Sequence, residues 1–182
     1  MYRLFVAIRP PIPIREQLLN LMRGVDNARW QQDEQLHITL RFIGEVDRHQ
    51  GEDVAAAIRA VRGTPFQLCL SGVGAFRKRG KGTLWAGVAP HQSLNSLHKK
   101  VDRACLRAGI AADHRAYHPH ITIARIGPHT GPIDTFVQQW AGLTSPEFPV
   151  GSIGLFQSSS LPLFPLSPAA SEHLGPNASC CQ

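Results

Sequence analysis

One eight-residue segment occurs twice in this chain of 182 residues. Residues 37–44 read HITLRFIG and residues 120–127 read HITIARIG, so five of the eight aligned positions are identical. Each copy alternates polar and aliphatic residues at its start and ends at a glycine, which is typical of a β-strand followed by a turn. A unit of this kind that recurs in two similar halves predicts two related lobes.

Strand-like and helix-like patterns alternate along the rest of the chain. We expect Pro13 to be the first residue of one helix and Ser93 to cap the start of another. The predicted strands cover residues 2–8, 36–43, 66–73, 83–88 and 120–126, with one or two more between 148 and 157, and the predicted helices cover residues 13–24, 47–61, 93–109 and 133–140. Such a mixture indicates an α+β fold.

A hydrophobic content of 43% over this length suffices for one domain with a buried core. We expect residues 1–157 to form that domain. Residues 158–182 contain no Lys or Arg and many Ser and Pro, so we expect them to form a tail.

The net charge of +6 at pH 7 favours an anionic partner such as a phosphate ester or RNA. The four cysteines are too few for a disulfide framework, and we expect Cys69 and Cys105 to be buried thiols of a cytoplasmic protein. The apolar run at residues 4–8 is too short for a signal peptide or a membrane span. We therefore expect no membrane contact, and we also expect a monomer.

The repeated segment places its polar residues on one face of a strand. Residues two apart point the same way, so His37 lies beside Thr39 and His120 beside Thr122. If the two halves are related by an approximate two-fold axis, the two imidazoles face each other across a groove. Arg41 shares the face of His37 if its strand is regular, and it then either binds substrate or is a solvated charge at the rim.

Two facing histidines can open a cyclic phosphodiester. A neutral imidazole takes a proton from the attacking water, while a protonated imidazole gives a proton to the departing sugar oxygen. The ordinary histidine pKa of about 6.5 allows both forms at neutral pH. The hydroxyls of Thr39 and Thr122 can donate hydrogen bonds to the non-bridging phosphate oxygens. This chemistry requires no metal, no cofactor and no nucleophilic side chain.

Other residues allow alternative interpretations. His114, His118 and His120 have a spacing that zinc could use, but Pro119 and the absence of a helical pattern argue against a zinc site. The basic segment at residues 77–81 (RKRGK) can attract RNA phosphates or form a solvated turn. Three aromatic residues can stack on a base or pack in the core, and we expect the core; they are Trp30, Trp85 and Phe42.

The paired His-x-Thr motifs resemble those of the 2H phosphoesterase superfamily, in its RNA 2′,3′-cyclic phosphodiesterase branch (2′-5′ RNA ligase-like, LigT-like). Further resemblance lies in residues 3–8 (RLFVAI), 29–30 (RW), 84–88 (LWAGV) and 118–125 (HPHITIAR). It spans residues 3–157 in all. The family's closing strand has a Ser-Leu pair followed by Gly-x-x-Tyr. Here residues 157–161 (QSSSL) begin that pattern and the rest is missing.

This resemblance implies a bilobal 2H phosphoesterase-like fold, with two pseudo-symmetric lobes of antiparallel sheet and helices around a central groove. It implies that His37 is the proton donor and His120 the proton acceptor, and that Arg125 helps to bind the phosphate. The expected reaction is hydrolysis of RNA 2′,3′-cyclic phosphate ends to 2′-phosphomonoesters, with 2′-5′ RNA joining as its reverse.

Two alternatives to this reaction remain open at the level of sequence. One is a module that binds an RNA end or nucleotide phosphate without turning it over. The other is a 2H phosphodiesterase that acts on another 2′-5′ or small cyclic phosphate substrate.

Overall fold

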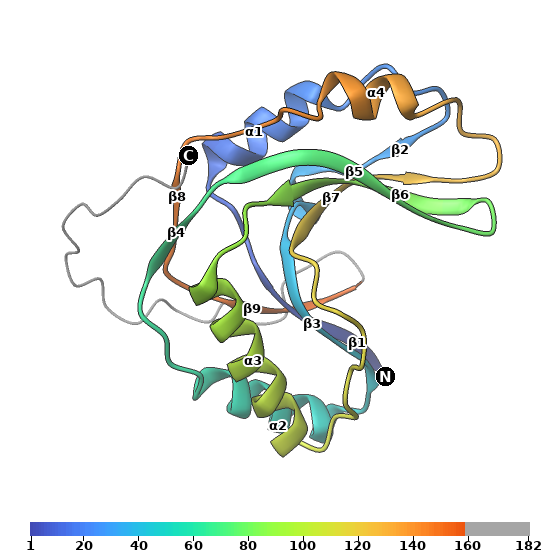
Figure 1. Ribbon diagram of the computed structural model, residues 1–182. Helices are drawn as coiled ribbons and strands as arrows, with labels where there is room; N and C mark the ends of the chain where they lie inside the picture. Colours follow the sequence, from blue (N-terminus) through green and yellow to red (C-terminus); the bar gives the residue numbers. More distant parts are fainter. Residues whose placement is uncertain (159–182) are drawn as a thin grey trace.

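The computed structural model describes residues 1–158, so the tail predicted for residues 158–182 lies outside the described residues except for Ser158 (Figure 1). Strands and short helices alternate as the sequence predicts. The elements are β1 (Tyr2–Ile8), α1 (Ile12–Leu21), β2 (Arg29–Trp30), the 3-10 turn η1 (Asp33–Gln35), β3 (Ile38–Val46), α2 (Arg48–Arg59), β4 (Phe66–Leu68), β5 (Leu70–Lys78), β6 (Lys81–Val88), α3 (Gln92–Arg107), β7 (His120–Ile126), α4 (Asp134–Gln139), β8 (Phe148–Val150) and β9 (Gly154–Gln157).

The main sheet is antiparallel and consists of two halves that mirror each other in order. Its strands follow the sequence β5-β6-β7-β3-β1-β9, with β2 added to β7, while β4 and β8 form a separate two-stranded sheet. In one half a helix, α1, connects the paired strands β1 and β3. In the other half α3 connects β6 and β7 in the same way. The predicted α+β class with two related antiparallel lobes is thus confirmed.

A single residue pair joins the two halves. Ile38 of β3 pairs with Ile121 of β7, and each is the second residue of its repeated motif. Both isoleucines are completely buried. Since neighbours along a strand point to opposite faces, the residues that flank this pair turn away from the core, and the pair marks the axis that relates the two motifs.

Both motifs contain a β-bulge at the same place, directly after the threonine. In the pairing of β3 with β1, Leu40 is the extra residue, because Val6 lies opposite Arg41 and Ala7 opposite Thr39. In the pairing of β7 with β6 the extra residue follows Thr122 in the same way. A bulge of this kind reverses the alternation of the side chains beyond it.

The bulges overturn two expectations that assumed regular strands. Arg41 does not share the face of His37, because the bulge turns its side chain into the buried side, where it is 4% exposed. Phe42, expected in the core, is 52% exposed. At the equivalent positions of β7, Ala124 is buried and Arg125 is exposed.

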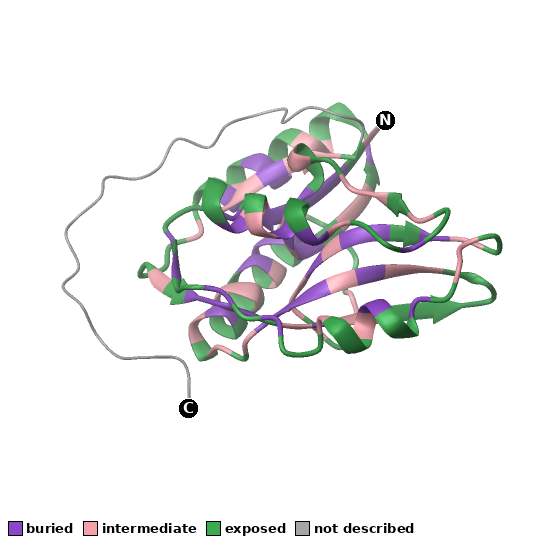
Figure 2. Cartoon of the chain, turned by 90° about the horizontal axis from the view of Figure 1, so that it is seen from above, coloured by how far each residue is buried: buried purple, intermediate pink, exposed green. Residues whose placement is uncertain are grey.

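The helices cover the apolar side of the sheet in two pairs. In Figure 1, α2 and α3 lie together against β1 and β3, whereas α1 and α4 lie together on the other half. Figure 2 shows the buried residues along the strands and on the helix faces turned towards them. Cys69 and Cys105 are buried, as expected, and neither forms a disulfide with a described residue. Within residues 1–158 no helix has both the length and the apolar character needed to cross a bilayer.

Several element boundaries differ from the prediction. The helix expected from Ser93 begins one residue earlier, because the His91 imidazole caps it by accepting the Ser93 N–H at 3.2 Å. The strand predicted over residues 66–73 is divided into β4 and β5. Helix α1 ends at Leu21, three residues before Gly24, which has a φ of +83°.

Replacing Ile121 by alanine should lower the free energy of unfolding by about 2–5 kcal/mol, because it opens a cavity at the only pair that joins β3 to β7. Urea denaturation measures this change. Leu106→Ala on α3 is the matched control, since Leu106 is 42% exposed and its loss should change stability little. Equal losses in the two variants would contradict a central role for the Ile38–Ile121 pair.

Candidate active site

The face opposite the buried isoleucines carries the four polar residues of the repeat. His37, Thr39, His120 and Thr122 are all half-buried. They lie on both sides of the Ile38–Ile121 pair, as the symmetry of the two motifs requires. The structure therefore brings these four predicted site residues to one face of the sheet.

A backbone carbonyl holds the His120 ring in one tautomer. The Nδ1 atom of His120 lies 2.7 Å from the carbonyl oxygen of His118. A carbonyl oxygen can only accept, so Nδ1 must carry the hydrogen and donate it. In the neutral ring this leaves the Nε2 atom with a lone pair, which is what a proton acceptor needs.

The His37 ring is held in the corresponding way. Its hydrogen-bond partner is the backbone of Gln35, two residues earlier, as His118 is two residues before His120. Both imidazoles thus interact with the backbone two residues before them. Sequence reasoning missed both contacts, because a carbonyl partner leaves no signal in residue type.

Aromatic rings surround His37 on its other sides. The Phe5 ring centroid lies 4.7 Å from that of His37, and the Phe156 ring stacks at 6.3 Å. Burial is the main cause that lowers the pKa of His37, the backbone of Gln35 opposes the shift, and the nearby His120 and Arg125 lower the pKa as well. Together these effects bring it to about 4.

The environment of His120 is similar but comes from other strands. Phe76 of β5 meets the His120 ring edge-on at 5.1 Å, and Trp85 of β6 lies at 6.1 Å. Burial lowers the pKa of His120, the carbonyl of His118 opposes this shift, and the His118 side chain at 6.0 Å lowers the pKa further. Both imidazoles are therefore neutral at pH 7 in the free protein.

Three polar side chains on this face are positioned to meet an anion. The hydroxyls of Thr39 and Thr122 have no hydrogen-bond partner among residues 1–158 and are free to donate to a ligand. Arg125 is exposed, and its charge acts on His37. The bulge after Thr122 is what turns Arg125 onto the histidine face.

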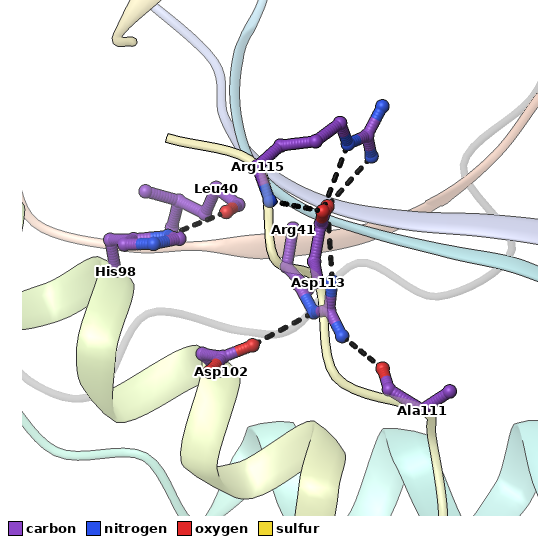
Figure 3. A network of polar contacts seen from close by, with 7 residues as sticks. All are labelled: Leu40, Arg41, His98, Asp102, Ala111, Asp113 and Arg115. Atoms are coloured by element: carbon purple, nitrogen blue, oxygen red, sulfur yellow. Dashed lines mark hydrogen bonds and ion pairs between the residues drawn. The ribbon is translucent and has the colours of Figure 1, made fainter. Parts of the chain in front are cut away.

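Arg41, predicted as a substrate-binding residue, lies instead in a buried ion cluster on the other side (Figure 3). Its Nε atom is 3.0 Å from Asp102 of α3, and its Nη1 atom is 3.1 Å from Asp113. The guanidinium also donates to the carbonyl oxygen of Ala111. Arg41 therefore ties strand β3 to helix α3 and to the connection that leads into β7.

A second contact reinforces the same connection. The Nδ1 atom of His98 on α3 lies 2.9 Å from the carbonyl oxygen of Leu40, the bulged residue, as Figure 3 shows. The His98 ring also stacks on the ring of Tyr117, with 3.9 Å between centroids. Tyr117 directly precedes His118, whose carbonyl holds His120.

Metal coordination has no visible basis in the described part of the chain. Within residues 1–158 no three or more His, Cys, Asp or Glu side chains come together in a way that could hold a metal ion. His114 and His118, which the sequence spacing grouped with His120, are both exposed.

A sheet that joins two His-x-Thr motifs across its midline defines the fold of the two-histidine phosphoesterases. The family model described as the 2′-5′ RNA ligase superfamily matches residues 10–160. The chain belongs to this superfamily.

Known relatives agree with this assignment. The chain is 35% identical to an RNA 2′,3′-cyclic phosphodiesterase of Geobacillus stearothermophilus over 133 residues, which cover 71% of this chain but only 42% of that protein. It is 29% identical to a protein of the same name from Archaeoglobus fulgidus over 168 residues, which cover 90% of this chain and 95% of that one.

The solved structures include close matches of the fold. Escherichia coli LigT, in a crystal structure with 3′-AMP, superposes with a TM-score of 0.70 at 26% identity, and the match covers 88% of this chain and 90% of that one.

Replacing Arg41 and Arg125 by glutamine, one at a time, should show that only Arg41 is needed for stability. Arg41→Gln leaves the carboxylate of Asp102 without its counter-charge and leaves Asp113 paired with Arg115 alone, and we expect a loss of about 3 kcal/mol because these carboxylates are partly exposed. Arg125→Gln on the open face should change the free energy of unfolding by less than about 0.5 kcal/mol. Urea denaturation of both variants tests this, and an equal loss in both would refute the assignment of Arg41 to a structural cluster.

The free energy of unfolding should fall as the pH is lowered from 7 to 4.5. The pKa of His37 is about 4 in the folded chain, against about 6.5 when unfolded, so the unfolded chain binds the proton more readily in this range. The lowered pKa of His120 acts in the same direction. Urea denaturation at a series of pH values measures the slope.

His37→Gln should show a weaker dependence of stability on pH than the unmodified protein. His129→Gln is the control, because His129 is exposed and its loss should leave the slope unchanged. A wild-type stability that stays constant between pH 7 and 4.5 would contradict the burial of the two imidazoles.

Proposed function

We propose that this protein hydrolyses 2′,3′-cyclic phosphodiester ends of RNA to 2′-phosphomonoesters by acid–base catalysis with His37 and His120. The observation that carries the proposal is the pair of half-buried imidazoles on one face of the sheet, each of which interacts with the backbone two residues earlier. The names of the relatives support the choice of substrate. The roles of donor and acceptor follow the family resemblance.

In this mechanism His120 removes a proton from water through Nε2, and the water oxygen forms a bond to phosphorus. The bond between phosphorus and the 3′ oxygen breaks, and protonated His37 gives its proton to that oxygen. The hydroxyls of Thr39 and Thr122 donate to the non-bridging oxygens, and Arg125 adds a positive charge nearby. The phosphate then remains on the 2′ oxygen.

The acid role of His37 depends on the substrate. Its pKa of about 4 means that the ring is neutral in the free protein at pH 7. A phosphodiester anion between the motifs offsets the positive charge of Arg125 and favours the protonated ring, which raises the pKa of His37. Binding of the anion therefore supplies the condition that the acid step needs.

Joining of two RNA ends would use the same groups. A 5′-hydroxyl that takes the place of water attacks the cyclic phosphate, the 3′ oxygen leaves, and a 2′-5′ bond results. His120 would accept the proton of the 5′-hydroxyl, and His37 would again protonate the 3′ oxygen.

We also propose that residues 1–157 act as one domain in a cytoplasmic monomer. The buried cysteines Cys69 and Cys105, which form no disulfide with a described residue, fit a reducing compartment. Light scattering coupled to size exclusion measures the mass of the particle, and a dimer would overturn the monomer assignment.

The central experiment is hydrolysis of an oligoribonucleotide that ends in a 2′,3′-cyclic phosphate, with EDTA present. We expect turnover to a 2′-phosphate, and a loss of about 10²- to 10⁴-fold in kcat for His37→Ala and for His120→Ala. His49→Ala is the matched control, because His49 is an exposed histidine of α2 and should not affect turnover. Binding without turnover by the folded wild-type protein would instead favour a phosphate-binding module.

A second substrate separates the two histidines. A p-nitrophenyl phosphodiester releases a phenolate that needs no proton, so its hydrolysis should be much less sensitive to His37→Ala than to His120→Ala. The opposite order would exchange the assigned roles. Equal losses with this substrate would argue against a proton donor of any kind at His37.

A further inference from the structure

A hairpin with four cationic side chains lies beside the proposed active site. It is formed by the ends of β5 and β6, where Lys78 pairs with Lys81. Its cations are all exposed, and none makes an ion pair or a side-chain hydrogen bond within residues 1–158; they are Arg77, Lys78, Arg79 and Lys81. Figure 1 shows this hairpin at the side of the molecule away from α2 and α3.

The turn of this hairpin has an arginine, Arg79, at a position where the backbone conformation favours other residue types. Arg79 has a φ of +51° and Gly80 a φ of +75°, so both central residues of the two-residue turn are left-handed. Such turns prefer Asn, Asp or Gly at the first position, because a longer side chain is strained there. Arg79 thus places a cation at the tip against the local preference of the chain.

The surrounding half-sheet is free of opposing charge on its strands. None of β2, β5, β6 and β7 contains an Asp or Glu. Arg125 of β7 lies opposite Thr83 of β6 and opposite Arg29 of β2, so cations continue from the hairpin across the sheet to the residue whose charge acts on His37. Summed positive charge of this kind attracts a polyanion.

The same strands connect the hairpin to the histidines. Phe76 directly precedes Arg77, and its ring lies 5.1 Å from that of His120. Trp85 lies opposite Thr122. Lys81 is four residues before Trp85 in β6, which is a distance of about 13 Å between the two at the usual rise of a strand. The hairpin cations therefore lie beyond the reacting phosphate, where the next phosphates of a longer chain would run.

From this placement we propose that residues 77–81 bind the phosphate backbone of a single-stranded RNA whose cyclic end lies between His37 and His120. The inference rests on the proposed function and adds a second contact to it. The RNA chain beyond the cyclic end binds residues 77–81, so an oligonucleotide is a better substrate than a cyclic mononucleotide. The exposed ring of Phe76, between the histidines and the cations, offers a surface on which a base can stack.

The test compares two substrates, a cyclic 2′,3′-mononucleotide and a 20-nucleotide RNA with a 2′,3′-cyclic end. In the variant R77Q/K78Q/K81Q we expect kcat/KM for the RNA to fall roughly 10- to 100-fold, with kcat/KM for the mononucleotide unchanged. The salt dependence for the RNA should also weaken, by a slope of about 0.7 for each phosphate contact that is lost.

The matched control is K99Q/R103Q/R107Q, which removes the same charge from exposed positions of α3. It should leave both substrates unaffected. Arg79→Asn provides a second test, because it removes a charge from the tip while suiting the turn, so weaker RNA turnover with undiminished stability separates charge from folding.

Three results would each overturn the inference. They are an unchanged kcat/KM for the RNA in the hairpin variant, an equal loss of kcat/KM for both substrates, and an equal loss for the RNA in the α3 control. If the wild-type protein turned over neither substrate, the proposed function would fail instead. Fluorescence anisotropy with the same RNA would then decide the role of the hairpin, with weaker binding by the hairpin variant alone as the supporting result.

Discussion

The pairing of Ile38 with Ile121 is the contact on which the rest of the structure depends. It joins the two half-sheets, and it does so with the second residue of each repeated motif. Because both side chains are buried, the residues on either side of them must face outwards together. The site is thus a consequence of how the core is closed, and chemistry and folding share one position in the sheet.

The fold, and the common face of His37, Thr39, His120 and Thr122, could be predicted from the sequence because the repeat has a two-residue period as far as its threonine. Beyond the threonine the period fails, since each motif has an extra residue at its fourth position, Leu40 in one copy and Ile123 in the other. Arg41 and Phe42 therefore exchanged their expected faces. Local alternation cannot reveal a bulge whose cause is the pairing with a strand distant in sequence.

Other parts of the site come from segments with no motif of their own. Phe5, Phe76 and Phe156 lie on three different strands and meet the histidines only after the sheet has formed. Only Phe5 gave a signal in the sequence: it alternates with the core residues of its strand and therefore points to the face of the histidines. The carbonyl partners of the imidazoles left none, since every residue has a carbonyl oxygen.

The position that the shared bulge exposes adds to the asymmetry of the two motifs. At equivalent places of the two motifs it exposes Phe42 on one strand and Arg125 on the other. Two identical imidazoles related by a two-fold axis would treat both ester oxygens of a phosphodiester alike. A ring on one side and a cation on the other make the two sides of this face different, which gives the proposed reaction a physical basis for distinguishing the 2′ from the 3′ oxygen.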